Sequence, residues 1–451
     1  MNIITLQPLP KPTKAIVTIP GSKSYTNRAL LLAALTKGEI TIENPLLSDD
    51  TNAMRECLQA LGITIQEGHD SFIVSGDITQ IKNNEYHLNA RLSGTTIRFL
   101  LALCCVIPGT KILTGEEGLN KRPIGTLVDA LRELGAHISY LEKAGFPPVK
   151  ITSSKLTNHI VNMRGDISSQ YFSALLMIAP LMNGLTITVA GEQISKPYID
   201  MTIDSMKTFG VHPENDTYRT YTIADGQRYS ATAYRVEGDF SSAGYFMAIA
   251  ALTKSTITLK NLNPFSAQAD RKMLDVVSQM GTRVSDLNNS ITVQGNGVIP
   301  LTLDMIGFPD QAQTVAVLAA FADGVSVLKG IQSLRIKETE RVVAIQQELA
   351  KMGILTEATN DTLTIYGGNP KPAQISTYGD HRMAMSFAIA GSKLAGMSIE
   401  NPEVVNKTFP DFWKRLKLIG IEINSSGERK YKNKTTRGTR DTRDTPGTLK
   451  I

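Results

Sequence analysis

Cysteine, histidine and tryptophan are scarce in this chain of 451 residues, which has three, six and one of them. Cys57, Cys104 and Cys105 are an odd number of thiols without metal-ligand spacing, and the six histidines are scattered. We therefore expect no metal site. An odd set of cysteines also predicts buried thiols in a reducing compartment, and hence a cytoplasmic protein.

Long apolar runs, targeting segments and nucleotide-binding motifs are also missing. No apolar run approaches the roughly 20 residues of a membrane-spanning helix. The first ten residues have the character of neither a signal peptide nor a transit peptide. There is no GxxxxGKS/T motif and no GxGxxG motif after a predicted strand, so a nucleotide ligand is not supported. We expect no cofactor and no membrane association.

The excess of positive charge is confined to the end of the chain. Residues 427–451 hold eight lysines and arginines against three acids, and this difference equals the whole net charge of +5. The rest of the chain is therefore close to neutral, and a role in nucleic-acid binding would depend on this tail alone. We expect residues 425–451 to form a basic, disordered tail.

The body of the chain consists of one pattern repeated six times. Six segments share a Gly or Pro turn, a small polar cluster and an apolar helix too hydrophobic for a surface position. They begin at Pro20, Ser93, Gly165, Gly238, Pro309 and Gly379. Between them lie six amphipathic helices that end at a glycine before an alternating, strand-like run. These glycines are Gly62, Gly135, Gly210, Gly281, Gly353 and Gly420.

Six units of about 70 residues predict an α/β protein built from two halves of three units each. The midpoint lies near Val236–Gly238. We expect the opening strand, residues 3–19, to complete the second half. The predicted domains are then 20–236 and a discontinuous domain of 1–19 plus 237–424, joined by two crossovers.

The polar ends of the buried helices predict a site for anions. Lys23 and Arg28 lie at the start of the first helix, where the macrodipole is already positive. One such helix start is more typical of a solvated surface, but the pattern recurs six times. If three helices from each half point into one cleft, their partial charges add there.

Other candidate residues have an ordinary interpretation beside the functional one. Ser168, Ser169 and Gln170 form either an N-cap cluster or a neutral cradle for an anion. Asp310 is either a cap or a general base. The run of residues 334–341, LRIKETER, is by itself typical of an exposed, salt-bridged helix face.

Taken together, nine segments resemble the 5-enolpyruvylshikimate-3-phosphate synthases, in their bacterial form. The segments are PGSKSYTNRALLLAAL, SGTTIRFL, KRPIG, SSQYFSALL, SKPYIDMT, EGDFSSAGYF, LRIKETER, YGDHRMAM and KTFPDF. The resemblance extends from Pro20 to Phe412. It implies the two-domain enolpyruvyl transferase fold, with six βαβαββ units, three per domain, whose buried helix N-termini face the cleft.

The resemblance also implies a reaction of the shikimate pathway. The enolpyruvyl group of phosphoenolpyruvate would pass to the 5-hydroxyl of shikimate 3-phosphate, and phosphate would leave from a tetrahedral intermediate. We expect a monomer that acts on these two small molecules, without nucleic acid. The implied catalytic residues are Asp310 at the 5-hydroxyl, and Glu338 with Lys23 at the proton of C3.

The implied ligand contacts divide into two sets. Shikimate 3-phosphate would contact Lys23, Ser24, Arg28, Ser168, Ser169, Gln170, Ser195, Tyr198, Asp310, Ser333 and Lys337. Phosphoenolpyruvate would contact Lys23, Gly94, Arg122, Gln170, Arg341, Arg382 and Lys407. Three positions depart from the family pattern: Leu92 and Ser333 each replace an asparagine, and Phe99 replaces a proline common in one bacterial subgroup. These departures bear on the affinity for phosphoenolpyruvate mimics such as glyphosate.

Two alternatives remain at this point. An enolpyruvyl transferase that acts on UDP-N-acetylglucosamine has the same fold, but that family carries a reactive cysteine in the loop matching Glu116–Pro123, where this chain has none. A nucleic-acid-binding or RNA-end-processing repeat protein would use the basic tail, but the neutral body lacks interleaved aromatic residues.

Overall fold

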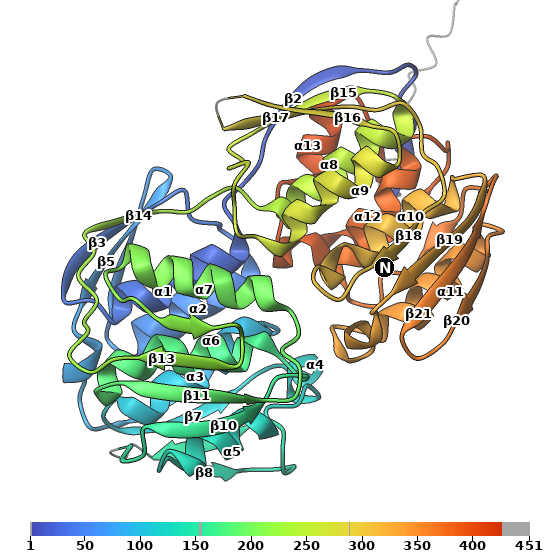
Figure 1. Cartoon of the computed structure of the whole chain (residues 1–451). Helices are drawn as coiled ribbons and strands as arrows, with labels where there is room; N and C mark the ends of the chain where they lie inside the picture. The colour runs from blue at the N-terminus through green and yellow to red at the C-terminus, as the bar shows by residue number, and fades with distance from the viewer. Residues whose placement is uncertain (1, 153–155, 288, 426–451) are drawn as a thin grey trace, which may run out of the picture.

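Two separate hydrophobic cores organise the computed structural model, which describes residues 2–152, 156–287 and 289–425 (Figure 1). One core takes its buried side chains from Tyr25 to Val236. The other combines residues 4–19 with residues 240–421. We propose that the cores mark two domains, 20–236 and 1–19 plus 237–424. The prediction of a disordered tail over 425–451 is wrong at Ser425, which belongs to strand β24 (Glu422–Ser425); the other residues of that prediction, 426–451, lie outside the described part.

The strands of the described residues form six four-stranded sheets with one topology. In one unit, β6 (Glu85–Asn89), α3 (Gly94–Val106), β7 (Thr110–Thr114), α5 (Gly125–Glu133), β8 (His137–Tyr140) and β9 (Val149–Thr152) follow each other. The sheet order is β6-β7-β9-β8. The first pair is parallel and the other two are antiparallel. This is the predicted βαβαββ unit.

The other five units repeat this topology, although in three of them one strand, β14, β2 or β1, comes from a distant part of the chain. Two of them belong to the first core. One consists of β10 (Ile160–Arg164), α6 (Ser169–Ile178), β11 (Leu185–Ala190), α7 (Lys196–Thr208), β12 (Glu214–Asp216) and β13 (Thr220–Ile223). The other consists of β14 (Ala233–Arg235), α1 (Lys23–Ala34), β3 (Gly38–Glu43), α2 (Asp49–Ala60), β4 (Thr64–Gly68) and β5 (Ser71–Gly76). The single-turn helix α4 (Glu117–Asn120) lies between β7 and α5.

The second core contains the remaining three units. One consists of β2 (Lys14–Thr18), α8 (Phe240–Thr253), β15 (Thr256–Lys260), α9 (Met273–Gln279), β16 (Arg283–Leu287) and β17 (Ser290–Gln294). The next consists of β18 (Thr302–Asp304), α10 (Ala312–Ala320), β19 (Gly324–Lys329), α11 (Arg341–Lys351), β20 (Leu355–Ala358) and β21 (Thr362–Gly367). The last consists of β22 (Gln374–Ile375), α12 (His381–Gly391), β23 (Ser398–Glu400), α13 (Phe412–Leu418), β24 and β1 (Ile3–Gln7). Short 3₁₀ helices are η1 (Ile78–Gln80), η2 (Ala179–Met182), η3 (Ala269–Lys272), η4 (Pro309–Gln311), η5 (Gln332–Ile336) and η6 (Pro402–Lys407).

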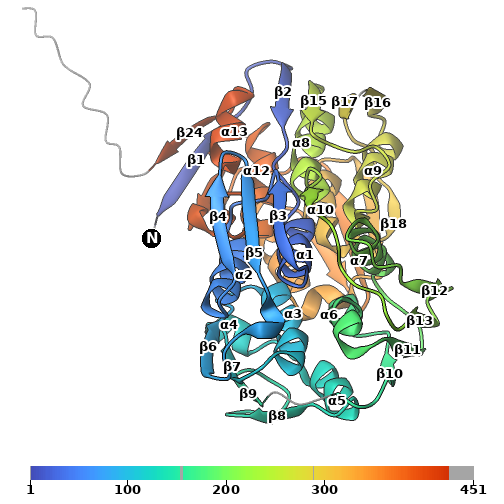
Figure 2. The ribbon, with the colours of Figure 1, turned by 90° about the vertical axis from the view of Figure 1, so that its left-hand side faces the viewer.

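The two cores exchange strands where the chain crosses between them. Strand β2 leads into α1 of the first core, yet it pairs in parallel with β15 of the second. Strand β14 leads into α8 of the second core, yet it pairs in parallel with β3 of the first. Figure 2 shows β2 beside β15, and β1 beside β24. The opening segment therefore does complete the second half, but as two strands in two sheets rather than the one predicted.

Two sequence signals locate the helices correctly. The six glycines predicted to end the amphipathic helices all have left-handed backbones, with φ between 78° and 107°, as a helix C-cap requires. The six apolar segments form α1, α3, α6, α8, α10 and α12, and their residues are almost entirely buried. Among the described residues, no helix is both long and apolar enough to cross a membrane.

Candidate active site

The starts of all six buried helices meet at one cavity between the two cores. Each start contributes a lining residue: Lys23 from α1, Thr95 from α3, Ser169 from α6, Ser241 from α8, Asp310 before α10 and Arg382 from α12. Because helix N-termini carry unpaired N–H groups and partial positive charge, their convergence favours anionic ligands. The predicted convergence of the six helix starts on one cleft is therefore confirmed, and the anion site that it favours stays a prediction.

Most of the sequence-predicted residues line this cavity or a smaller one that adjoins it. The larger cavity is lined by Lys23, Ser24, Arg122, Ser168, Ser169, Gln170, Ser195, Tyr198, Asp310, Ser333, Lys337 and Arg382. The smaller one shares several of these and adds Gly94, Glu338 and Arg341. Lys407 lines a third cavity on the same cleft and contacts Glu338.

Asp310 is surrounded by cations. Its carboxylate accepts a hydrogen bond from Arg382 Nη2 at 2.8 Å and one from Arg341 Nη1 at 3.3 Å. Lys337 Nζ lies 3.7 Å from the same carboxylate. Burial raises the pKa of Asp310, but the charges of Arg382, Lys337 and Arg341 outweigh it and hold the pKa below the ordinary value. Asp310 is therefore an ionised carboxylate in the free protein.

Glu338 has a matching set of cationic neighbours. Arg341 Nη2 donates to one carboxylate oxygen at 2.7 Å, and Lys407 Nζ donates to the other at 3.1 Å. Arg122 Nη1 lies 3.7 Å from the second oxygen. Burial raises the pKa of Glu338, yet Lys407, Arg341 and Arg122 hold it well below the ordinary value. Arg341 thus contacts both acids, and its side chain is buried.

The run LRIKETER does not form the exposed helix face that its charge pattern alone suggests. Residues 332–336 form η5, and α11 begins only at Arg341. Lys337 and Glu338 fall between them and turn toward the cleft. Asp380 fixes Arg341 from behind, accepting from its Nε at 2.7 Å. Burial of that ion pair is a tertiary effect, which the local charge pattern cannot encode.

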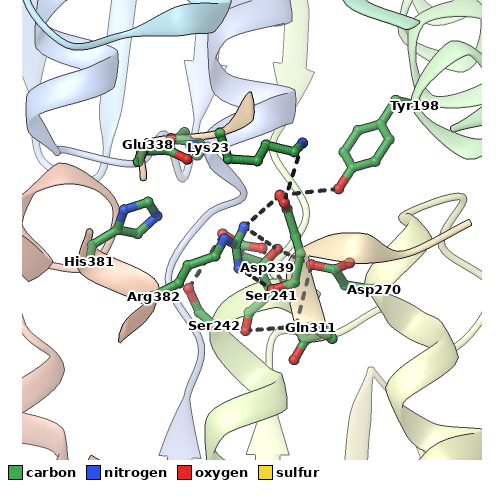
Figure 3. Close-up of polar contacts among 12 residues, drawn as sticks. Lys23, Tyr198, Asp239, Ser241, Ser242, Asp270, Gln311, Glu338, His381 and Arg382 are labelled. Atoms are coloured by element: carbon green, nitrogen blue, oxygen red, sulfur yellow. Dashed lines mark hydrogen bonds and ion pairs between the residues drawn. The ribbon is translucent and has the colours of Figure 1, made fainter. Parts of the chain in front are cut away.

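Two contacts join the cores directly across the cleft. Tyr198, on α7 of the first core, donates its hydroxyl to Asp310 Oδ2 of the second at 3.4 Å. The ion pair between Arg122 and Glu338 also crosses the cleft. Figure 3 shows the ring of Tyr198 directed toward the polar cluster around Arg382. Each predicted acid therefore has a partner on the opposite wall.

Polar side chains also connect the starts of α3 and α6. Gln170 Nε2 donates to Thr95 Oγ1 at 3.2 Å, and Arg98 Nη1 donates to Gln170 Oε1. Ser168 Oγ caps α6 by accepting from the backbone N–H of Gln170. The arrangement fixes the Gln170 amide at the cavity wall. Arg98 lines the cavity as well, although the sequence prediction did not include it.

Arg28 is the predicted contact that lines none of these three cavities. Its guanidinium donates to Thr202 Oγ1 at 2.7 Å, to the Tyr198 carbonyl at 2.9 Å and to the Ser24 carbonyl at 3.0 Å. It is absent from the cavity linings described above. In this structure Arg28 holds α7 against α1, and its contact with shikimate 3-phosphate stays a prediction.

The three departures from the family pattern have different surroundings. Ser333 lines the main cavity, where its short side chain leaves room. Leu92 is 40% exposed and lines the third cavity with Lys407. Phe99 is fully buried, with the Arg28 guanidinium 5.4 Å from its ring centre. Phe99 therefore acts on the site only through its neighbours.

Two residues outside the predicted set also belong to the site. Asp50 pairs with Lys23, with 3.1 Å between Oδ2 and Nζ, and lines the smaller cavity. His381 is buried at the same cavity, and its Nδ1 lies 3.4 Å from Asp380 Oδ1. Burial holds its pKa well below the ordinary value. Asp50 lies in an ordinary helix start, so only the fold brings it to Lys23.

The fold is that of the two-domain enolpyruvyl transferases. Two solved structures of EPSP synthase from Acinetobacter baumannii superpose with TM-scores of 0.80 and 0.78, at 24% and 23% sequence identity. Each comparison covers 94% of this chain and at least 99% of the other.

The sequence places the chain more narrowly. Residues 9–416 match the family model described as EPSP synthase (3-phosphoshikimate 1-carboxyvinyltransferase). A 3-phosphoshikimate 1-carboxyvinyltransferase of Sulfurovum sp. is 42% identical over 93% of this chain and 99% of that protein. A 3-phosphoshikimate 1-carboxyvinyltransferase of Shewanella amazonensis is 41% identical over 92% of this chain and 98% of that protein. The chain belongs to the EPSP synthase family, a family of transferase enzymes.

Proposed function

We propose that the cleft transfers the enolpyruvyl group of phosphoenolpyruvate to the 5-hydroxyl of shikimate 3-phosphate. The observation that supports this most is the convergence of six helix N-termini and several cations on two carboxylates. Both substrates are anions, and the reaction needs an acid and a base on opposite sides of the bond that forms. Membership of the EPSP synthase family names this reaction.

The larger cavity suits shikimate 3-phosphate. Ser168, Ser169 and Gln170 present hydroxyl and amide donors at the start of α6, and Lys337 adds a cation. The smaller cavity suits phosphoenolpyruvate, with Arg122, Arg341 and Arg382 placed for its carboxylate and phosphate. Asp310 lines both cavities, so it stands where the acceptor hydroxyl meets the enol carbon.

The reaction proceeds by addition and elimination. Asp310 takes the proton of the 5-hydroxyl as its oxygen bonds to C2. C3 gains a proton from the ammonium of Lys23, or from Glu338 once bound substrate has drawn away its cations and it has taken up a proton. In the second step C3 loses a proton to the same pair, the C2–C3 double bond re-forms, and the bond from C2 to the phosphate oxygen breaks. Arg122, Arg341 and Lys407 stabilise the charge on the departing phosphate.

The low pKa of Asp310 in the free protein has a consequence for this step. Three cations hold its charge, so alone it is a weak base. Anionic substrates compete for Arg382, Arg341 and Lys337, and neutralising these charges raises the basicity of Asp310 toward the useful range. Substrate binding thereby activates the base.

Phosphate release tests the proposal. Purified protein mixed with phosphoenolpyruvate and shikimate 3-phosphate should release phosphate in proportion to the limiting substrate. Either substrate alone should release none. UDP-N-acetylglucosamine in place of shikimate 3-phosphate serves as the control for the related transferase. Absence of release with the first pair, or release with UDP-N-acetylglucosamine, would refute the proposed acceptor.

We propose that the enzyme acts as a monomer in the cytoplasm on these two small molecules. Cys57, Cys104 and Cys105 are all free and buried, which suits a reducing compartment. Both walls of the cleft come from one chain, so a second copy is not needed to complete it.

A further inference from the structure

Asp270 lies behind the cavity wall and contacts it through one residue. It is a buried residue of η3, 3% exposed, and it is not one of the residues that line the larger cavity. Its Oδ2 accepts from the hydroxyl of Ser241, and from Gln311 Nε2 at 3.3 Å. Ser241 itself lines the cavity at the start of α8. Figure 3 shows Asp270, Ser241 and Gln311 together in one cluster.

Ser241 also contacts the cation that holds the predicted base. Arg382 Nη2 lies 3.4 Å from Ser241 Oγ and donates to Asp310 Oδ2 at 2.8 Å. A continuous series of polar contacts therefore extends from Asp270 through Ser241 and Arg382 to Asp310. A change in the charge of Asp270 therefore reaches Arg382 and the anion that it would hold through the hydroxyl of Ser241, in addition to the direct attraction between Asp270 and Arg382.

The hydroxyl of Ser241 has only one hydrogen to give. Arg382 is always a donor, so the oxygen of Ser241 accepts from it. While Asp270 is ionised, the hydrogen of Ser241 is committed to its carboxylate. When Asp270 is protonated, its own O–H can donate to Ser241, and the hydrogen of Ser241 becomes available to an anion in the cavity.

The surroundings of Asp270 favour protonation of its carboxylate. Within the described part of the chain, two buried acceptors of the cluster have no donor, Asp270 Oδ1 and Gln311 Oε1. Burial raises the pKa of Asp270 to about 6, together with the charges of Asp310 and Asp239, against the lowering effects of Arg382 and of the hydrogen bond from Ser241. On its own element, Arg271 donates to the Pro264 carbonyl and Lys272 pairs with Asp275.

We infer that Asp270 is a positioning residue for the anion subsite: its protonation releases the hydroxyl of Ser241 to bind the anion that Arg382 holds. This inference rests on the proposed function, under which that anion is phosphoenolpyruvate. The ionised form of Asp270 withdraws one donor from the site, whereas the protonated form supplies it.

Two variants separate the two states. Asp270→Asn places a neutral donor amide where the protonated carboxyl would be, so the KM for phosphoenolpyruvate should stay low from pH 6 to pH 8. Ser241→Ala removes the hydroxyl, so this KM should be high at both pH values. In the unmodified protein, the KM for phosphoenolpyruvate should be close to that of Asp270→Asn at pH 6. It should rise toward that of Ser241→Ala at pH 8, by about tenfold, because a hydrogen bond to a charged group is lost.

The measurement is the KM for phosphoenolpyruvate and kcat, with saturating shikimate 3-phosphate, taken as ratios of variant to unmodified protein at each pH. The ratio cancels the ionisation of the substrate itself, whose phosphate also titrates near pH 6. Asp200→Asn is the matched control: Asp200 is half-buried, its pKa is raised by burial, and Tyr218 donates to it away from the cavity. The ratio of the KM for phosphoenolpyruvate in Asp200→Asn to that in the unmodified protein should stay constant with pH.

A ratio for Asp270→Asn that is the same at pH 6 and pH 8 would overturn the inference, because a purely structural role affects both alike. So would a Ser241→Ala variant that keeps the unmodified pH profile; this variant also provides the test if Asp270→Asn does not fold. Failure of the unmodified protein to release phosphate would instead refute the proposed function.

Discussion

Gly21 and Gly238 face each other in an isolated antiparallel bridge, at the point where the two connections between the cores pass side by side. The backbone N–H of Ser22 donates to the Glu237 carbonyl at 2.7 Å, and that of Asp239 donates to the Pro20 carbonyl at 2.9 Å. Each glycine thus lies between reciprocal hydrogen bonds. The two crossovers form a single paired joint between the domains.

Two asparagines hold this joint in the same way from either side. Asn44 Nδ2 donates to the Val236 carbonyl at 2.8 Å, and Asn261 Nδ2 donates to the Ile19 carbonyl at 2.9 Å. Both asparagines have left-handed backbones, with φ of 53° and 66°. A Cβ at Gly21 would overlap the carbonyl oxygen of Asn44, and one at Gly238 that of Asn261.

A methyl group at either glycine should therefore separate the joint. We expect Gly21→Ala and Gly238→Ala each to lower the free energy of unfolding by about 1–3 kcal/mol, because backbone must move to make room. Denaturant unfolding measures the effect. Gly368→Ala is the control, since a Cβ there meets no atom within 4 Å. Equal effects at all three positions would contradict the steric explanation.

Neutral replacements of the two carboxylates should affect turnover rather than binding. Asp310→Asn and Glu338→Gln keep the shape of each side chain but remove its capacity to take up a proton. We expect each to lower kcat by about 10²–10⁴-fold with a much smaller change in KM. Steady-state kinetics measure both constants, and Glu357→Gln on the exposed face of β20 is the control. Wild-type kcat in either variant would disprove its assigned role.

Asp270 should make the free protein less stable at pH 6 and above than at pH 4. Its pKa is raised from 3.8 to about 6, so between these values the native state keeps a proton that the unfolded state has released. The free energy of unfolding then falls as the pH rises through this window. A difference of about two units between the folded and unfolded pKa values lowers the free energy of unfolding by about 3 kcal/mol.

Asp270→Asn removes this ionisation. We expect the variant to gain stability relative to the unmodified protein at pH 7.5, by up to about 3 kcal/mol, and to gain little at pH 4. Thermal unfolding at the two pH values measures the difference. A gain that is equal at pH 4 and pH 7.5 would show that the charge of Asp270 is not its source.

A buried lysine at the far end of α3 should contribute to stability alone. Lys111 is fully buried, and its Nζ donates to the carbonyls of Cys104 at 3.1 Å and Gly109 at 3.0 Å, and to that of Ile107. Lys111→Met keeps the stem but leaves these carbonyls without their donor. We expect a loss of about 1–3 kcal/mol.

Thermal unfolding and kcat together test this prediction. The exposed Lys150 on the neighbouring strand β9 provides the control, and Lys150→Met should change stability little. The kcat of Lys111→Met at 25 °C should equal that of the unmodified protein. A loss of turnover without a loss of stability would contradict a purely structural role.

The repeats could be predicted from the sequence because their signals are local. A glycine after an amphipathic helix has one common structural use, and Gly62 and Gly353 both adopt the expected left-handed backbone. The convergence of helix starts followed from their repetition, since six polar clusters on buried helices need a shared place to face. The fold and the location of the site could therefore be predicted from the sequence.

The partners within the site could not be predicted because they come from different helices. Asp50 reaches Lys23, and Asp380 reaches Arg341, only after separate helices have packed. The sequence analysis assigned the opening segment to the second half, but it did not predict that this segment forms two strands in two sheets, nor which sheet β14 joins, for a related reason. A strand of five or three residues carries no mark of which sheet it joins, and pairing across the chain decides that.

The exchange of β2 and β14 has a consequence for synthesis on the ribosome. Strands β1 and β2 are made first, but their partners β15, β23 and β24 are among the later parts of the chain. At about 5–20 residues per second, the opening segment waits for tens of seconds before these partners emerge. During that interval the nascent chain carries two unpaired strands at its beginning, so its yield in the cell depends on what shields them.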